Sequence, residues 1–110
     1  MQEATFKGKS VIIADAAYGI GRHLALAMGR AGARLLLTDV HPEGLRETCE
    51  RIQDTGGEAH ALWLNESSRP EGVLERAREL FGRIDFACFT GGDGVLRVAP
   101  VMSAAPGAGE

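Results

Sequence analysis

The sequence is poor in cysteine and histidine. Only two of its 110 residues are cysteines, Cys49 and Cys88, and they do not have C-x-x-C spacing. This argues against a disulfide framework and against a zinc site, so we expect both thiols to be reduced and structural. The three histidines, His23, His41 and His60, also lack the spacing of a metal site. We therefore expect no bound metal.

Long apolar runs and an excess of charge of one sign are missing as well. No segment approaches the roughly 20 apolar residues that a membrane-crossing helix needs. The first residues are too polar for a secretory signal. The formal net charge is only −3, which gives no basic surface for nucleic acid. We expect a cytoplasmic protein that binds neither membranes nor nucleic acid.

Strand and helix patterns alternate along the chain. Hydrophobic residues at 45% and charged residues at 25% are typical of a globular protein, and 110 residues allow one domain at most. Strands are expected at residues 10–14, 34–38, 59–64 and 84–89. The helices between them are expected to end at Gly32, Gly56 and Gly82. Ser68 and Glu71 are expected to form a capping box at the start of the third helix.

This alternation predicts an α/β fold with a doubly wound parallel sheet. Because crossovers between parallel strands are right-handed, the four strands should have the order 3-2-1-4. The first and fourth strands then flank the point where the strand order reverses, and ligands bind at that point in such sheets. After residue 93 the pattern gives way to glycine, alanine and proline, so we expect residues 94–110 to be a mobile tail.

A glycine-rich turn, Tyr18-Gly19-Ile20-Gly21, lies between the first expected strand and the following helix. The amide groups and the dipole at such a helix start favour a phosphate group. Asp39 ends the next strand about 20 residues further on, where a carboxylate can bond both ribose hydroxyls. The turn and Asp39 predict a Rossmann-like dinucleotide site within residues 1–93. A plain tight turn followed by a solvated aspartate is the simpler alternative.

Three stretches resemble the short-chain dehydrogenase/reductase family. VIIADAAYGIGR at residues 11–22 is similar to the family's T-G-x-x-x-G-I-G turn, and IDFACFTGG at residues 84–92 is similar to its I-D-x-L-V-N-N-A-G strand. ELFGRID at residues 79–85 is also typical of the family. The resemblance covers roughly residues 6–105, and it implies the N-terminal dinucleotide-binding half of the family's domain, with NAD as the cofactor.

The resemblance implies cofactor-binding roles for Asp15, Tyr18, Gly19, Ile20, Gly21, Asp39, Asn65, Gly91 and Gly92. Asn65 stands where the family has an aspartate that contacts adenine, and it keeps an acceptor and a donor for that contact. Asp39 would repel the 2′-phosphate of NADP. The positions that often carry a basic residue in NADP-using relatives are Tyr18 and Val40 here. We therefore expect NAD to be preferred over NADP.

Two groups of substitutions depart from the family pattern near the expected cofactor. Asp15 replaces the first glycine of the turn. A carboxylate about 4 Å from a phosphate is repelled by ~1 kcal/mol in water and by ~4 kcal/mol at an effective dielectric of 20, which weakens binding by about one to three decades. Phe89 and Thr90 replace the two asparagines of the N-N-A-G motif. NAD binding is therefore expected to be weak or lost.

The largest departure concerns catalysis. The resemblance implies a proton relay by a Tyr-x-x-x-Lys pair and a serine, which in the family lie beyond the point where this chain stops. The only tyrosine is Tyr18, and Arg22 follows it at the lysine position. We therefore predict no catalytic residue.

Three hypotheses about function follow. The first is a truncated short-chain dehydrogenase unit, a pseudoenzyme that retains weak NAD binding and does not transfer hydride alone. The second is an interaction module, in which the strand at 84–89 has an uncovered apolar edge that pairs with a second copy, as a homo-oligomer, or with an intact dehydrogenase subunit. The third is half of an NAD-dependent oxidoreductase that another chain completes.

Overall fold

The computed structural model describes residues 6–90 and 93–101. The elements are, in chain order, β1 (Ser10–Ala14), α1 (Gly19–Arg30), β2 (Arg34–Asp39), α2 (Pro42–Asp54), β3 (Glu58–Trp63), α3 (Pro70–Phe81), β4 (Phe86–Thr90) and β5 (Leu96–Pro100). Apart from β5, which the sequence did not predict, the observed strands and helices match the predicted ones within about two residues at their ends, which is the usual spread of such boundaries.

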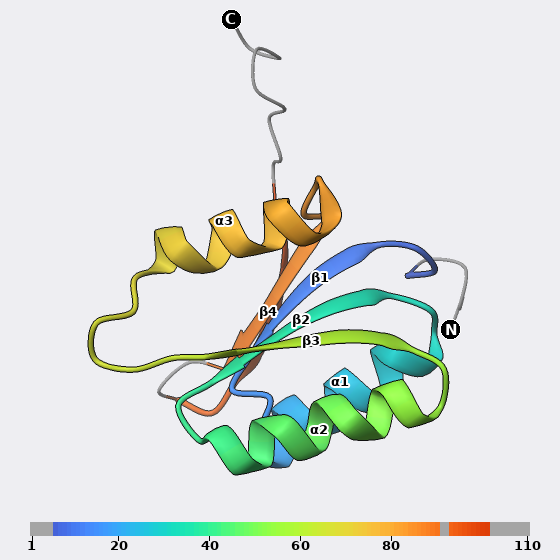
Figure 1. The fold of residues 1–110 in the computed structure, drawn as a ribbon, viewed down its shortest axis with the longest axis horizontal. Coiled ribbons are helices and arrows are strands. Elements are labelled where there is room, and N and C mark those ends of the chain that lie inside the picture. Colours follow the sequence, from blue (N-terminus) through green and yellow to red (C-terminus); the bar gives the residue numbers. More distant parts are fainter. Residues whose placement is uncertain (1–5, 91–92, 102–110) are drawn as a thin grey trace, which may run out of the picture.

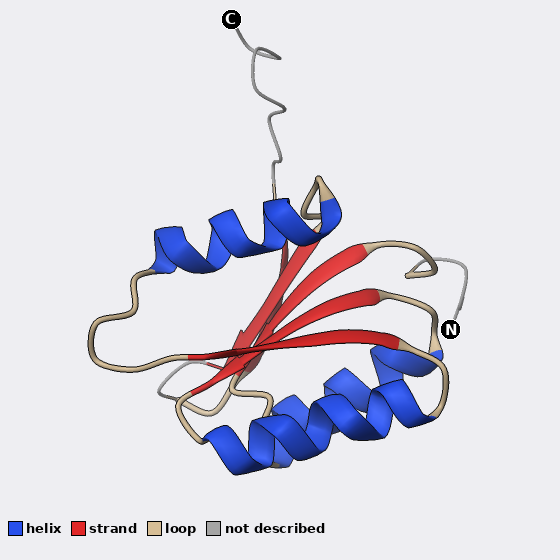
Figure 2. Cartoon of the chain, in the orientation of Figure 1, coloured by secondary structure: helices blue, strands red, loops and turns tan. Residues whose placement is uncertain are grey.

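The strands form one sheet with the order β3-β2-β1-β4-β5. β1 to β4 are parallel to one another, so the predicted Rossmann-like order 3-2-1-4 is confirmed. Helices α1 and α2 cover one face of the sheet and α3 covers the other, as Figure 1 and Figure 2 show. None of the helices within the described residues is both long and apolar enough to cross a membrane.

The central strands are buried on both faces, as their continuous apolar sequences indicate. Alternate residues face opposite helices because side chains alternate along a strand. The cluster beneath α1 and α2 includes Val11, Ile13, Leu35 and Leu37. The cluster beneath α3 includes Ile12, Leu36 and Phe81. Each of these buried side chains contributes roughly 1.5–3 kcal/mol, which makes β1 and β2 a rigid base for the glycine turn.

The structure corrects the prediction for the C-terminal segment. Within the expected mobile tail of residues 94–110, residues 96–100 form β5, which pairs antiparallel with β4. Gly94 has a φ of 77°, and Asp93 accepts a hydrogen bond from the Val95 N–H, so the chain can reverse. The prediction that strand 84–89 has an uncovered edge is therefore wrong, because β5 pairs with that edge. Residues 102–110 lie outside the described part of the chain.

The predicted capping box at the start of the third helix is also wrong. The Ser68 hydroxyl oxygen accepts a hydrogen bond from the Asn65 N–H (2.9 Å), and the Asn65 side-chain oxygen accepts one from the Ser67 N–H (2.8 Å). Helix α3 begins at Pro70 without a side-chain cap. The serine and asparagine side chains bond nearby backbone groups and form a tight turn, which competes with helix capping.

Candidate functional site

The glycine-rich turn and the three residues before it, together residues 15–21, are called the glycine turn from here on. This turn lies at the carboxyl ends of the parallel strands, where β1 passes into α1 (Figure 1). β2 pairs with β1 on one side and β4 pairs with it on the other. The turn is therefore at the point where the strand order reverses, which is where doubly wound sheets bind ligands.

The start of α1 has unbonded amide groups. Tyr18 precedes the helix without making a side-chain cap, and the first turn of the helix has no acidic residue. The Arg22 N–H donates the first intrahelical bond to the Tyr18 carbonyl (3.3 Å). The amides of Gly19, Ile20 and Gly21 consequently have no partner inside the helix. Such a helix start, with its positive dipole end, is suited to bind a phosphate.

Two glycines give the turn its shape for different reasons. Gly19 has a φ of 60° and open space where a Cβ would be, so a ligand can approach its backbone. A Cβ on Gly21 would overlap the carbonyl group of Asp15. Position 21 must therefore be glycine for α1 to start this close to the end of β1.

Asp15 lies at the start of the turn with its side chain exposed. Its φ of 57° makes it the only residue other than glycine with a positive φ within the described residues. This left-handed conformation suits glycine best, and aspartate tolerates it better than most residues. The turn therefore keeps the backbone shape that the sequence pattern implies, with a negative charge added at its surface.

Asp39 lies beneath the turn and is only 6% exposed. Its Oδ2 accepts a hydrogen bond from the Ala17 N–H (2.8 Å), and its Oδ1 accepts one from the His41 N–H (3.0 Å) and lies 2.9 Å from the His41 ring nitrogen Nδ1. Burial raises the pKa of the Asp39 carboxyl, but the hydrogen bonds from Ala17 and His41 outweigh it, so that this pKa is lower than its ordinary value. The ionised carboxylate therefore stabilises the turn. Its expected contact with ribose stays a prediction.

Tyr18 lies over the start of α2. Its ring packs on Gly44, where a Cβ would overlap the ring. The Arg22 guanidinium carbon lies 5.2 Å from the centroid of the same ring, and the His41 ring centroid lies 5.8 Å from it. These contacts hold the ring at the surface next to Asp39, and 54% of the Tyr18 residue remains exposed.

The remaining predicted site residues lie in other segments. The Leu64 N–H donates to the Asp39 carbonyl (2.9 Å), so the loop that carries Asn65 begins beside Asp39. Asn65 itself is exposed, and its side-chain oxygen is engaged by Ser67. Gly91 and Gly92 lie outside the described residues. The structure thus brings residues 15–21 together with Asp39, and it places Asn65 in an adjacent loop.

Sequence reasoning missed Thr48. This residue is fully buried on α2, and its hydroxyl donates to the Ala16 carbonyl in the glycine turn (2.8 Å). One feature of the sequence could have indicated its role: Thr48 is a polar residue on the apolar face of α2 that Leu45, Cys49 and Ile52 form. A buried hydroxyl needs a hydrogen-bond partner, and here the partner is the turn.

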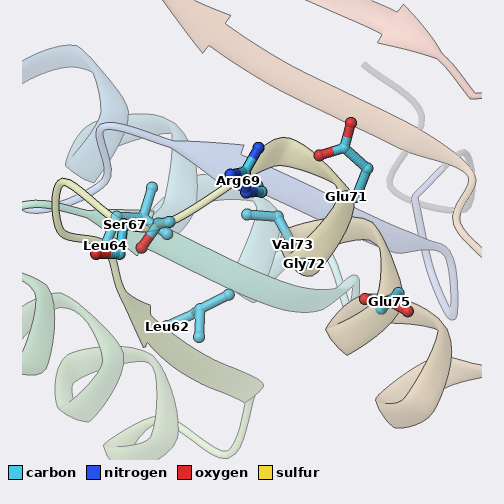
Figure 3. A pocket seen from close by; sticks show the side chains of 9 residues that line it. Leu62, Leu64, Ser67, Arg69, Glu71, Gly72, Val73 and Glu75 are labelled. Atoms are coloured by element: carbon cyan, nitrogen blue, oxygen red, sulfur yellow. The ribbon is translucent and has the colours of Figure 1, made fainter.

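A cavity of about 400 Å³ lies apart from the glycine turn, between the end of β3 and the start of α3. Leu62, Leu64 and Val73 contribute apolar side chains to its lining, and Ser67 and Arg69 contribute polar ones (Figure 3). It contains no turn residue. Within residues 6–90 and 93–101, no group of three or more acidic, histidine or cysteine side chains is arranged to hold a metal ion.

Comparison with known proteins gives relatives that are oxidoreductases. An uncharacterized oxidoreductase of Thermotoga maritima is 35% identical over 80 residues, which are 73% of this chain and 32% of that protein. Human epidermal retinol dehydrogenase 2 is 36% identical over 73 residues, 66% of this chain and 24% of that protein. The chain thus spans about a third or less of the length of these relatives.

Solved structures give the same result. A short chain dehydrogenase/reductase from Burkholderia phymatum in complex with NAD superimposes with a TM-score of 0.71 at 28% identity, over 79% of this chain and 31% of that one. Hydroxysteroid dehydrogenase from Escherichia coli gives a TM-score of 0.69 at 28% identity, over 74% and 34%. The family model for short chain dehydrogenase matches residues 9–103, and this chain therefore belongs to the short-chain dehydrogenase family.

Proposed function

We propose that this chain is a short-chain dehydrogenase module that binds the adenosine diphosphate part of NAD weakly and does not transfer hydride on its own. The observation that carries the proposal is the uncapped start of α1 at the carboxyl edge of the sheet. Its three amides and the open space at Gly19 are suited to a pyrophosphate. The NAD complex of the Burkholderia relative supports this choice of ligand.

The residues of the turn fit this cofactor only in part. The amides of the first helical turn and the glycine at position 19 fit a pyrophosphate. Asp15 does not, because its exposed carboxylate carries the same charge as the phosphates. We infer that Asp15 weakens NAD binding without abolishing the shape of the site.

The charge beside the ribose position favours NAD over NADP. The ionised Asp39 would repel a 2′-phosphate, and we propose that its oxygens accept hydrogen bonds from ribose hydroxyls in addition to those from Ala17 and His41. Two neighbouring side chains, Tyr18 and Val40, are neutral. The nearby Arg22 guanidinium is paired with Glu47 (2.9 Å). NADP should therefore bind more weakly than NAD.

The chain lacks the pair of side chains on which the family's proton relay depends. Its only tyrosine, Tyr18, packs on Gly44 beside the first turn of α1. Its two lysines, Lys7 and Lys9, precede β1, and Lys7 lies against Gly32 at the amino edge of the sheet, opposite the glycine turn. Within these 110 residues, Tyr18 and the two lysines therefore do not form the Tyr-x-x-x-Lys pair that the family resemblance implies.

Trp63 gives a direct way to test cofactor binding. It is the only tryptophan, it is 54% exposed, and its indole N–H donates to the Val40 carbonyl next to Asp39 (3.1 Å). A saturable change in its fluorescence on addition of NAD, with a weaker response to NADP, is the expected result. Equal responses to both dinucleotides would overturn the preference, and no response from either the native chain or Asp15→Gly would overturn the proposal.

The other two hypotheses have less support. Pairing with a partner through β4 required an open strand edge, and β5 occupies that edge. If another chain completed the sheet with a strand parallel to β4, that strand would have to displace β5 from the edge of β4. A module that binds a nucleotide alone needs neither change.

A further inference from the structure

The inner side of the glycine turn is held by hydrogen bonds from two other elements. The Ala16 N–H donates to the Thr38 carbonyl (3.1 Å), and the Ala17 N–H donates to the Asp39 carboxylate (2.8 Å). The Ala16 carbonyl accepts from the Thr48 hydroxyl (2.8 Å). Ala16 and Ala17 are both fully buried. These inward-facing polar groups therefore have partners from β2 and α2.

The Thr48 hydroxyl joins three parts of the fold. Its oxygen accepts a hydrogen bond from the Arg22 Nε–H on α1 (2.8 Å). The same oxygen lies within donating distance of two carbonyls, that of Ala16 in the turn (2.8 Å) and that of Gly44 on α2 (3.0 Å). The same guanidinium donates to the Gly44 carbonyl (3.0 Å) and to Glu47 (2.9 Å), both on α2. One buried hydroxyl thus connects the turn, α1 and α2.

We propose that Thr48 is a positioning residue for the dinucleotide site, an inference that rests on the proposed function. By holding the Ala16 carbonyl inward, it fixes the chain that leads to the free amides of Gly19 to Gly21. A carbonyl turned outward at this point would present a lone pair to the phosphates. Amides held in place before the ligand arrives bind it more tightly, because no ordering cost remains at binding.

Three variants separate positioning from general stability. Thr48→Val removes the hydroxyl with little change in shape and leaves the Ala16 carbonyl and the Arg22 Nε–H without this partner. Thr48→Ser retains the hydroxyl. Thr55→Val is the matched control, because the Thr55 hydroxyl also bonds a backbone carbonyl, that of Ile52 (3.0 Å), but at the opposite end of α2.

The test measures NAD affinity by calorimetry in the Asp15→Gly background, where we expect binding to be strongest. Thr48→Val should weaken the affinity about tenfold, Thr48→Ser should restore it, and Thr55→Val should leave it unchanged. Hydrogen exchange of the Ala17 amide in the nucleotide-free chain provides a readout that needs no ligand. We expect it to be faster in Thr48→Val and unchanged in Thr55→Val.

Equal affinities of Thr48→Val and Thr48→Ser, or an equal loss in Thr55→Val, would overturn the positioning role. If Asp15→Gly itself shows no NAD binding, the proposed function fails instead, and the exchange data still decide whether Thr48 holds the turn. Unchanged exchange at Ala17 in Thr48→Val would then overturn that role as well.

Discussion

At the level of single residues, the turn depends on a backbone contact that only glycine allows at position 21. Gly21→Ala should destabilise the fold by about 1–3 kcal/mol, because the added methyl group overlaps the carbonyl of Asp15. Gly72→Ala is the control: Gly72 also lies in the first turn of a helix, but a Cβ there meets nothing within 4 Å. Denaturant unfolding should show the control as stable as the native chain or slightly more stable. Equal losses of stability in Gly21→Ala and Gly72→Ala would show that overlap with the Asp15 carbonyl is not the cause.

Asp39 gives the fold a dependence on pH. Its folded-state pKa lies below the ordinary value, so its stabilising contribution is complete above about pH 4 and is lost as the pH falls through the lower folded-state pKa. Asp39→Asn should be less stable at neutral pH and should lose less stability on acidification. Unfolding midpoints across this range test the prediction, with Asp54→Asn at the exposed end of α2 as the control. Parallel pH profiles of Asp39→Asn and the native chain would contradict it.

The sequence predicted which residues form the turn but not what holds them. Asp39 was expected to face a ligand, and its hydrogen bond to Ala17 joins residues that are 22 positions apart. Thr48 lies in the apolar stripe of α2, where its partner 32 positions away leaves no local pattern. Such contacts depend on how the elements pack, which spacing within one element does not specify.

Among the elements, the parallel part of the sheet was predictable and its last strand was not. Val11 to Ile13 and Leu35 to Leu37 are continuous apolar runs, and that pattern is typical of strands covered on both faces. In β5, Arg97 and Val98 are both exposed, so no apolar face distinguishes the strand from a loop. Its pairing with β4 follows from the reversal at Gly94.

Removal of β5 should leave the edge of β4 unpaired. A chain that ends at residue 93 should self-associate, because backbone groups of β4 and the partly exposed Phe89 would become available for pairing. A chain that ends at Val101 retains β5 and is the control. Light scattering at increasing concentration would show the difference. A monomeric chain ending at residue 93 would contradict the protective role of β5.

For the whole molecule, we propose that the chain binds NAD without turning it over. The purified chain should produce no NADH from NAD and any alcohol, because its only tyrosine packs on Gly44 and its lysines precede β1. Absorbance measurements over long incubations, with an intact short-chain dehydrogenase as a positive control, check this. Alcohol-dependent NADH formation by the chain alone would show that other residues supply the proton relay.

We propose that Asp15 weakens NAD binding at this site, and that claim is tested most directly by calorimetric titration with NAD. Three chains suffice: the native chain, Asp15→Asn and Asp15→Gly. Asp15→Asn removes the charge and keeps a side chain that tolerates the φ of 57°, whereas Asp15→Gly removes the charge and also suits that backbone. We expect both variants to bind NAD about ten- to a thousandfold more tightly than the native chain, with Asp15→Gly at least equal to Asp15→Asn. Equal affinity in all three chains, or no binding in any, would contradict it.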